Sequence, residues 1–127
     1  MSNPMTTPGA FSWIELMTTD TEAAKKFYGD LFGWTFEKTQ GFDYEIIKLA
    51  GQMAGGMMGM PPGCPPGTPP CWGNYVTVAS ADETAAKVKS LGGKVLVGPQ
   101  DIPTVGRFAV LQDPQGAVIS IMQWAKR

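Results

Sequence analysis

An internal repeat constrains this chain more than any other feature. Residues 13–25, WIELMTTDTEAAK, are echoed 62 positions later by residues 75–87, YVTVASADETAAK. Each copy continues to a Leu-x-Gly stop, at residues 31–33 and 91–93. A strand–helix unit used twice predicts a pseudo-twofold fold with a pocket between or within its halves.

Composition predicts one packed domain and excludes several classes of partner. The 127 residues, 43% hydrophobic and 17% charged, are typical of a single globular domain. A formal charge of −1 predicts neither nucleic acid nor an anionic membrane as partner. No apolar run reaches the roughly 20 residues of a transmembrane helix. The start, MSNPMTTPGAF, does not resemble a signal peptide and is expected to be a flexible lead-in of a cytoplasmic protein.

The first half reads as strand, helix and three strands. Apolar residues 11–17 end at Thr-Thr-Asp, so a strand there leads into a helix capped by Thr19 or Asp20. The helix, residues 21–32, is expected to pack a stripe on the core: Ala24, Phe27, Tyr28, Leu31 and Phe32. Gly33 ends this helix. Strands are predicted at 34–37, 43–49 and 52–60.

A proline-rich linker separates this half from one that repeats its order. Residues 61–70 hold six prolines and two glycines, which exclude a regular element. The second half predicts strand 73–79, helix 82–91, strands 94–98 and 106–112, a turn at 113–116 and strand 117–124. The chain is thus a single α+β domain of two βαβββ modules that form a curved sheet around a cleft. Their bounds are about 10–60 and 72–124, with the linker at about 61–71.

The two cysteines, Cys64 and Cys71, lie in and beside this linker. A disulfide between them would close a short loop, which a reducing cytosol disfavours. Two thiols without histidine make a poor metal site. Both are expected to be free thiols.

Several of these motifs together resemble the vicinal oxygen chelate superfamily of glyoxalases, bleomycin-resistance proteins and dioxygenases. The resemblance rests on Phe27-Tyr28, on Leu31-Phe32-Gly33-Trp34, and on Asp113-Pro114-Gln115-Gly116 before the last strand. It covers roughly residues 11–124 and is greatest to small glyoxalase-related proteins of undefined function.

The resemblance also implies where a metal would bind. Members with a metal hold it with His, Glu or Gln on the first and last strand of each half. The matching positions here are Trp13, Gly56 or Met57, Gly73 and Ser120. These residues do not form a divalent-metal site, so we expect no metal and no other cofactor.

Strand alternation predicts which side chains would line the cleft. Phe11, Trp13, Glu15 and Met17 would face it while Ile14 and Leu16 pack on the helix. In the second half Val76, Val78, Ile119 and Ile121 would lie behind the cleft wall. The candidate ligand-binding residues are Trp13, Glu15, Met17, Tyr75, Thr77, Arg107, Ser120 and Met122. Trp13 and Tyr75 have an alternative role as plugs of a closed core.

Glu15 is the candidate catalytic residue because a carboxylate on the inner face of a strand is costly unless it is used or paired. It would act as a general base or as a ligand anchor. The alternative is a salt bridge to Arg107 or Lys48. Without histidine, nucleophilic triads are excluded.

Three functions remain open. The first is metal-independent binding of a small apolar or aromatic organic molecule. The second is a lyase, isomerase or hydroxylase/dioxygenase-type enzyme, with Glu15 as base in a metal-free version. The third is a structural module that forms a homodimer through its Met-rich segment; Met53, Met57, Met58 and Met60 would otherwise fill the core.

Overall fold

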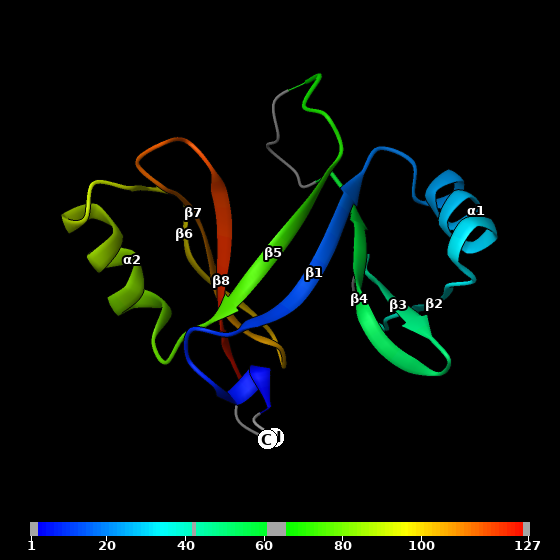
Figure 1. The fold of residues 1–127 in the computed structure, drawn as a ribbon, viewed down its shortest axis with the longest axis horizontal. Helices are drawn as coiled ribbons and strands as arrows, with labels where there is room; N and C mark the ends of the chain where they lie inside the picture. Colours follow the sequence, from blue (N-terminus) through cyan, green and yellow to red (C-terminus); the bar gives the residue numbers. More distant parts are fainter. Residues whose placement is uncertain (1–2, 42, 61–65, 126–127) are drawn as a thin grey trace. The chain divides into compact units, whose positions relative to one another are not determined.

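The computed structural model describes residues 3–41, 43–60 and 66–125 (Figure 1). By contacts the chain divides into two compact units. We call Trp13–Gly73 the first module, and Met1–Ser12 with Asn74–Arg127 the second module. The division falls inside the first and fifth strands.

The first module contains a four-stranded arrangement and one helix. In chain order its elements are β1 (Phe11–Thr18), α1 (Thr21–Phe32), β2 (Thr35–Lys38), β3 (Glu45–Leu49) and β4 (Gln52–Gly59). The strands lie in the order β2-β3-β4-β1, with β1 parallel to β4 and the other pairs antiparallel. Every predicted element of this half is present, within two residues of its predicted bounds.

Local chemistry explains where α1 begins and ends. The Asp20 side chain accepts a hydrogen bond from the backbone N–H of Ala23 at 3.0 Å, which caps the first turn. Gly33 adopts φ 75°, a left-handed conformation that glycine reaches at little cost, and ends the helix. The predicted cap and stop are both confirmed.

The second module repeats this order. Its elements are β5 (Cys71–Thr77), α2 (Ala81–Ser90), β6 (Lys94–Ile102), β7 (Gly106–Gln112) and β8 (Val118–Trp124). The strands lie in the order β5-β8-β7-β6, with β5 parallel to β8 and the other pairs antiparallel. The α+β class and the doubled βαβββ frame are therefore confirmed.

Each module has its own apolar core on the side of its sheet that faces the helix. In the first module the core is Leu16, Ile47 and Met57. In the second it is Ala81, Ala109, Leu111 and Ile121, with Val76, Val78 and Ile119 packed against it. The predicted split of the strands is confirmed for these residues. Ile14 shares the alternation of Leu16, but it is 48% exposed, so the predicted packing of Ile14 on the helix is wrong.

The α1 stripe is only partly packed, which corrects the prediction. Ala24 and Tyr28 pack against the first-module core. Phe27, Leu31 and Phe32 remain 59%, 57% and 52% exposed. A stripe at helical spacing is wider than the strip of helix that the sheet covers, so its outer members stay in solvent.

The N-terminal segment is not a loose lead-in, contrary to expectation. Residues Pro4–Thr6 form a single 3-10 turn, η1. Thr77 fixes the segment: its hydroxyl donates to the Pro4 carbonyl at 2.7 Å, and its backbone bonds to Gly9 and Ala10. These ladder bonds add the segment to the second module.

The linker and the cysteines are described only in part. Residues 66–70 form no helix or strand, in agreement with the prediction, and residues 61–65 lie outside the described part of the chain. Cys71 is a free, exposed thiol at the start of β5. Cys64 falls among the residues not described. No helix in the described ranges has the length and apolarity needed to cross a bilayer.

Candidate functional site

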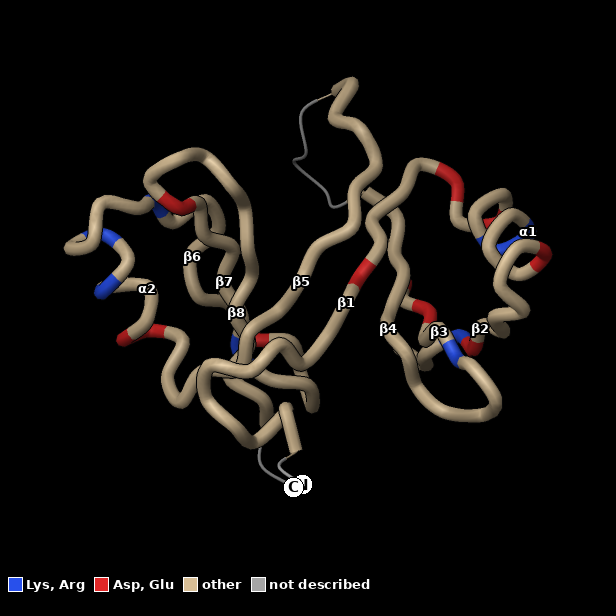
Figure 2. The backbone as a smooth tube through the Cα atoms, viewed as in Figure 1, with Lys and Arg blue, Asp and Glu red and all other residues tan. Residues whose placement is uncertain are grey.

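The first module buries a carboxylate in the middle of β1. Glu15 is 7% exposed, although its neighbours on the strand are mainly apolar. Figure 2 shows the acidic position within β1, whose one acidic residue is Glu15. Because Leu16 points into the core under α1, alternation places Trp13 and Glu15 on the opposite face of the sheet. A buried carboxylate requires a hydrogen-bond partner, and one comes from the segment that precedes β3.

Tyr44, which precedes β3, links Trp13 to Glu15. The Trp13 Nε1–H donates to the Tyr44 hydroxyl at 2.8 Å, and that hydroxyl donates to Glu15 Oε2 at 2.7 Å. The Tyr44 backbone is held by Thr39, whose N–H donates to the Tyr44 carbonyl at 2.9 Å and whose hydroxyl donates to the same oxygen. The result is a directed chain of hydrogen bonds that ends at the carboxylate.

Gly56 makes this chain possible. The strand β4 lies between β3 and β1, and Gly56 is the register partner of Glu15. A β-carbon at Gly56 would overlap the hydroxyl and the ring of Tyr44. The absent side chain therefore opens the path by which Tyr44 crosses β4. We call Trp13, Glu15, Tyr44 and Gly56 the Glu15 site.

The chemistry of the Glu15 site follows from its donors. The indole N–H donates to the Tyr44 hydroxyl, and the hydroxyl in turn donates to Glu15, so the carboxylate is held as an acceptor. Burial strengthens each of these hydrogen bonds relative to water. The site can accept a hydrogen bond from a ligand's O–H or N–H, or accept a proton from an acidic group placed against it.

The suggested salt bridge of Glu15 with Lys48 is wrong, because Lys48 binds Glu37 at 3.1 Å. Arg107, the other suggested partner, binds two acids of its own module, Asp82 through Nε and Asp101 through Nη1, both at 3.0 Å. Glu15 accepts a hydrogen bond from the neutral hydroxyl of Tyr44.

A second buried carboxylate in the same module has a structural partner. Glu45, 5% exposed, lies on the helix side of β3 and pairs with Lys25 of α1 at 3.1 Å. Lys25 also contacts Glu22 at 2.7 Å. The hydrogen bonds to Glu22 and Glu45 raise the pKa of Lys25 above its usual value. This ion pair ties α1 to the sheet.

The second-module candidates divide between the two faces of their sheet. Tyr75 pairs in register with Ser120, and Thr77 with Met122, so these four candidates lie side by side. Thr77 Oγ1 accepts a hydrogen bond from Trp124 Nε1 at 3.2 Å and donates one to the Pro4 carbonyl. Both partners of this hydroxyl therefore lie within the second module.

Arg107 is not brought to that group. On β7 it alternates in phase with Ala109 and Leu111, which belong to the core under α2, and its guanidinium reaches Asp82 on α2. In the first module, Met17 is half-buried on the same strand as Glu15.

The positions that carry metal in related folds do not offer a ligand set. Trp13 donates to Tyr44, Gly56 lies beneath that tyrosine, and Met57 is buried in the core. Gly73 has no side chain and Ser120 supplies only a hydroxyl. Within the described ranges no group of three or more His, Cys, Asp and Glu side chains is arranged to hold a metal ion. The residues at these positions therefore do not fit a divalent metal ion.

Sequence reasoning missed two members of the Glu15 site. Tyr44 was read only as part of a strand, and Gly56 only as a possible metal position. The available signal was weak: Tyr44 shares its alternation with Ile46, opposite the core residue Ile47. A glycine in the middle of a strand also marks a close approach by another group.

Comparison with known proteins places the chain in a family. The model for the Glyoxalase/Bleomycin resistance protein/Dioxygenase superfamily matches residues 10–121. The chain is 39% identical over 118 residues to CFP32 of Mycobacterium tuberculosis, whose name marks it as a suggested glyoxylase; the match covers 91% of this chain and 44% of that protein. It is 32% identical over 133 residues to the anthracycline biosynthesis protein DnrV of Streptomyces peucetius, covering 94% and 48%. The chain thus spans about half the length of these relatives.

A solved structure shows the same fold. Methylmalonyl-CoA epimerase from Mycobacterium tuberculosis superposes with a TM-score of 0.65 and 16% identity, over 95% of this chain and 92% of the epimerase. That identity supports the fold alone. The family match and the curated relatives go further, and on their strength the chain belongs to the Glyoxalase/Bleomycin resistance protein/Dioxygenase superfamily.

Proposed function

We propose that this protein binds a small, largely aromatic organic molecule at the Glu15 site, with the Glu15 carboxylate as its polar anchor. The observation that carries the proposal is the chain from Trp13 through Tyr44 to Glu15 across Gly56. Two side chains and a glycine without one hold a single buried carboxylate. A pair of apolar side chains would fill the same space at lower cost, so the arrangement is better explained by use of the carboxylate.

The site chemistry also indicates the class of ligand. A carboxylate that already accepts a hydrogen bond from Tyr44 favours a ligand that offers a further O–H or N–H, and it disfavours an anion. The aromatic faces of Trp13 and Tyr44 and the thioether of Met17 suit a planar apolar body. This class agrees with the name of one relative, an anthracycline biosynthesis protein, because anthracyclines are polycyclic aromatic compounds.

A screen of neutral hydroxylated aromatic compounds tests the proposal. Hits from ligand-observed NMR are measured by calorimetry against the wild type, Glu15→Gln and the control Asp82→Asn, whose carboxylate lies in the second module. We expect Glu15→Gln to weaken binding by about tenfold or more, as for loss of a hydrogen bond to a charged group, and the control to leave it unchanged. Equal affinity in wild type and Glu15→Gln contradicts the proposal, as does a screen without hits.

A second candidate function is supported by the 2.7 Å contact of Tyr44 with Glu15. A carboxylate with a hydroxyl partner is suited to remove a proton from a carbon acid, as in a metal-independent lyase or isomerase of this superfamily. In this version Glu15 is the base. Incubation of each screening hit in D₂O tests it: exchange of a C–H for deuterium by the wild type and not by Glu15→Gln supports catalysis. Equal exchange in both excludes Glu15 as the base.

A further inference from the structure

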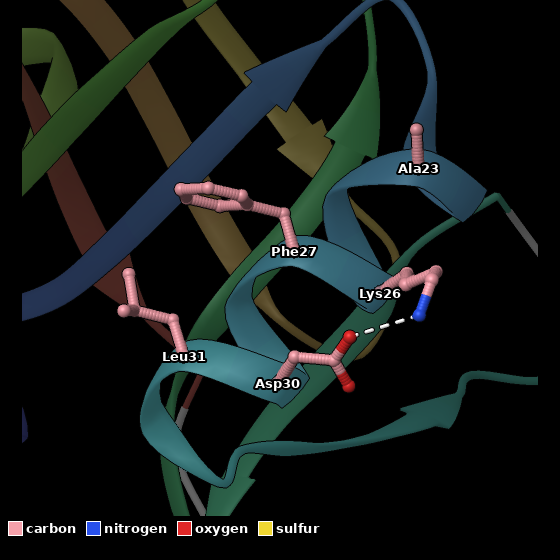
Figure 3. A pocket seen from close by; sticks show the side chains of 5 residues that line it. All are labelled: Ala23, Lys26, Phe27, Asp30 and Leu31. Carbon is pink, nitrogen blue, oxygen red and sulfur yellow. Dashed lines mark hydrogen bonds and ion pairs between the residues drawn. The ribbon is translucent and has the colours of Figure 1, made fainter.

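One face of the second-module sheet is covered, in contrast to the outer side of α1. Figure 3 shows Phe27 and Leu31 projecting from α1, where each leaves more than half of its surface in water. In the second module, Thr77 and Met122 lie on the face of the sheet opposite the α2 core, and they are only 4% and 3% exposed. The N-terminal segment supplies part of the cover over Thr77.

This segment is bound to Thr77 at three points. We call residues 3–10 the strap; its turn η1 lies near the end of β5 (Figure 1). The Thr77 hydroxyl donates to the Pro4 carbonyl at 2.7 Å. In the backbone, the Gly9 N–H donates to the Thr77 carbonyl and the Thr77 N–H donates to the Ala10 carbonyl, both at 2.9 Å. Thr77 is therefore the residue that holds the strap closed.

The strap is a thin cover over a buried surface. No residue of the strap is itself buried. Hydrogen bonds rather than apolar burial therefore hold it, and a segment held in this way opens at a lower free energy than the packed sheet. Thr77 stays in place when the strap opens, because β5 remains paired with β8 through Thr77 and Met122.

The chemistry under the strap is that of a hydrogen-bond donor in apolar surroundings. The Thr77 hydroxyl accepts a hydrogen bond from Trp124 Nε1 at 3.2 Å, and its own hydrogen is donated to the Pro4 carbonyl. Met122 and the Trp124 indole offer apolar surface on the same face of β8. A ligand that replaces the strap must supply what the strap supplies now, which is a carbonyl oxygen.

We propose that the second module has a ligand site of its own at Thr77, which the strap covers and which, when the strap opens, takes a neutral molecule with a carbonyl group on an apolar body. The repeat aligns Thr77 with Glu15, so the two sites occupy equivalent places in the two modules. Their chemistry is opposite, because Glu15 accepts a hydrogen bond and Thr77 donates one. The inference does not rest on the Glu15 site, since the strap, Thr77 and Trp124 all belong to the second module.

Amide hydrogen exchange in the full chain tests whether the strap opens by itself. The amides of Gly9 and Thr77 form the hydrogen bonds between strap and β5, whereas the Val78 amide donates to Met122 within the module's sheet. We expect the first two to exchange at least about tenfold faster than the Val78 amide, because opening of the strap releases only them.

Gly9→Ala weakens the closed strap without touching the site. Gly9 has φ 91°, and a β-carbon there meets no atom within 4 Å, so the substitution strains the closed backbone alone. It should speed the exchange of the Thr77 amide by about tenfold. Gly51→Ala is the matched control: Gly51 has φ 80° and equally empty surroundings, but it lies in the first module and should leave this exchange unchanged.

Acetophenone and ethylbenzene probe the site, because their bodies are alike and only acetophenone carries a carbonyl oxygen. Binding is followed by the indole N–H signal of Trp124 in ¹H–¹⁵N NMR spectra, assigned with Trp124→Phe. We expect Gly9→Ala to bind acetophenone about tenfold more tightly than the wild type, since apparent affinity rises with the fraction of open strap. It should also prefer acetophenone to ethylbenzene.

Substitutions of Thr77 test the donor. Thr77→Val loosens the strap but removes the hydroxyl, so it should bind the two compounds equally. Thr77→Ser keeps the hydroxyl and should retain the preference for acetophenone. Slow exchange of the Val78 amide shows in each variant that the sheet remains folded.

Three results would overturn the inference. They are Gly9 and Thr77 amides that exchange no faster than the Val78 amide, a Gly9→Ala protein that binds acetophenone no more tightly than the wild type, and a Thr77→Val protein that still prefers acetophenone. Such a failure leaves the proposed function untouched, because binding at the Glu15 site is tested with Glu15→Gln and different compounds.

Discussion

The two modules share a frame but differ where the repeat aligns Glu15 with Thr77. The Thr77 hydroxyl forms hydrogen bonds with Pro4 and Trp124 of its own module, while Glu15 accepts a hydrogen bond from Tyr44. The parallel partner strand explains the difference: Glu15 pairs with Gly56, and Thr77 pairs with Met122. A glycine leaves room for a side chain to cross the strand, and a methionine fills that room. The two modules share the repeated βαβββ frame, and Gly56 allows the first module to hold the Glu15 carboxylate.

The two helices also differ in how closely they pack against their sheets. The helix α2 buries Ala81 and Ala85 against its sheet, whereas α1 has no fully buried residue and leaves three large apolar side chains in solvent. Small side chains let α2 approach closely, while α1 is attached through Ala24, Tyr28 and the Lys25–Glu45 pair. The module that holds the candidate site is thus also the module whose helix leaves large apolar side chains exposed.

The largest expected effect comes from filling the crossing point. Gly56→Ala places a β-carbon where the Tyr44 ring lies, so Tyr44 must leave Glu15. We expect a loss of about 3 kcal/mol in the free energy of unfolding, from overpacking and from loss of the Tyr44 hydrogen bond to a buried carboxylate. Urea denaturation measures it.

Two controls accompany this variant. Gly98→Ala in β6 meets no atom within 4 Å and should change stability by less than about 0.5 kcal/mol. In a Tyr44→Ala background, Gly56→Ala should cost much less than it does alone. Additive effects of the two substitutions would show that Gly56 does not act through Tyr44.

An intermediate effect is expected from the ion pair that ties α1 to its sheet. Lys25→Met leaves the buried Glu45 without its cation, at a cost of about 2 kcal/mol because Lys25 itself is partly exposed. Lys26→Met is the neighbouring control: both partners of its ion pair are exposed, so its loss should have little effect on stability. Thermal unfolding compares them. Equal losses of stability in the two variants would contradict the expected difference between the partly buried pair and the exposed pair.

The pH dependence of this ion pair follows from the direction in which the pKa of Lys25 is shifted. The pKa of Lys25 is raised in the folded protein, so its contribution to stability is complete below the usual lysine pKa. That contribution is lost as pH rises through the higher folded value. The advantage of the wild type over Lys25→Met should therefore persist through neutral pH and shrink only in strongly alkaline solution.

The smallest effects compare the helices directly. Phe27→Gln on the outer face of α1 should change the free energy of unfolding by less than about 0.5 kcal/mol, because Phe27 is exposed. Ala85→Gln in α2 forces a polar side chain into a buried position and should cost about 1.5 kcal/mol. Chemical denaturation of both variants checks the pair. A larger loss from Phe27→Gln would mean that the stability of the folded chain depends on the outer face of α1.

Much of the fold could be predicted because its signals are local. The cap at Asp20, the stop at Gly33 and the apolar alternation around Val76 depend on neighbouring residues only. The Tyr44–Glu15 bond depends on three strands meeting in one register, which no local pattern contains. The exposed part of α1 was missed for a related reason, since periodicity shows which residues share a face and not how much of that face is covered.

The N-terminal segment was misread because its partner lies far along the chain. Nothing in the first ten residues indicates the ladder bonds to Thr77. Its glycine, prolines and polar residues are equally compatible with a flexible start.

The central claim is that a ligand hydroxyl meets the carboxylate that Tyr44 holds, and the indole signals of the four tryptophans test it most directly. In ¹H–¹⁵N NMR spectra, with the Trp13 signal assigned by Trp13→Phe, the protein is titrated with a hydroxylated aromatic hit from the screen and with its methyl ether. We predict that the hydroxylated compound moves the Trp13 signal to saturation, because Trp13 donates to Tyr44. The methyl ether should move it little, and Glu15→Gln should abolish the effect. A Trp13 shift that is unchanged in Glu15→Gln, or shifts confined to Trp34, Trp72 and Trp124, would contradict the claim.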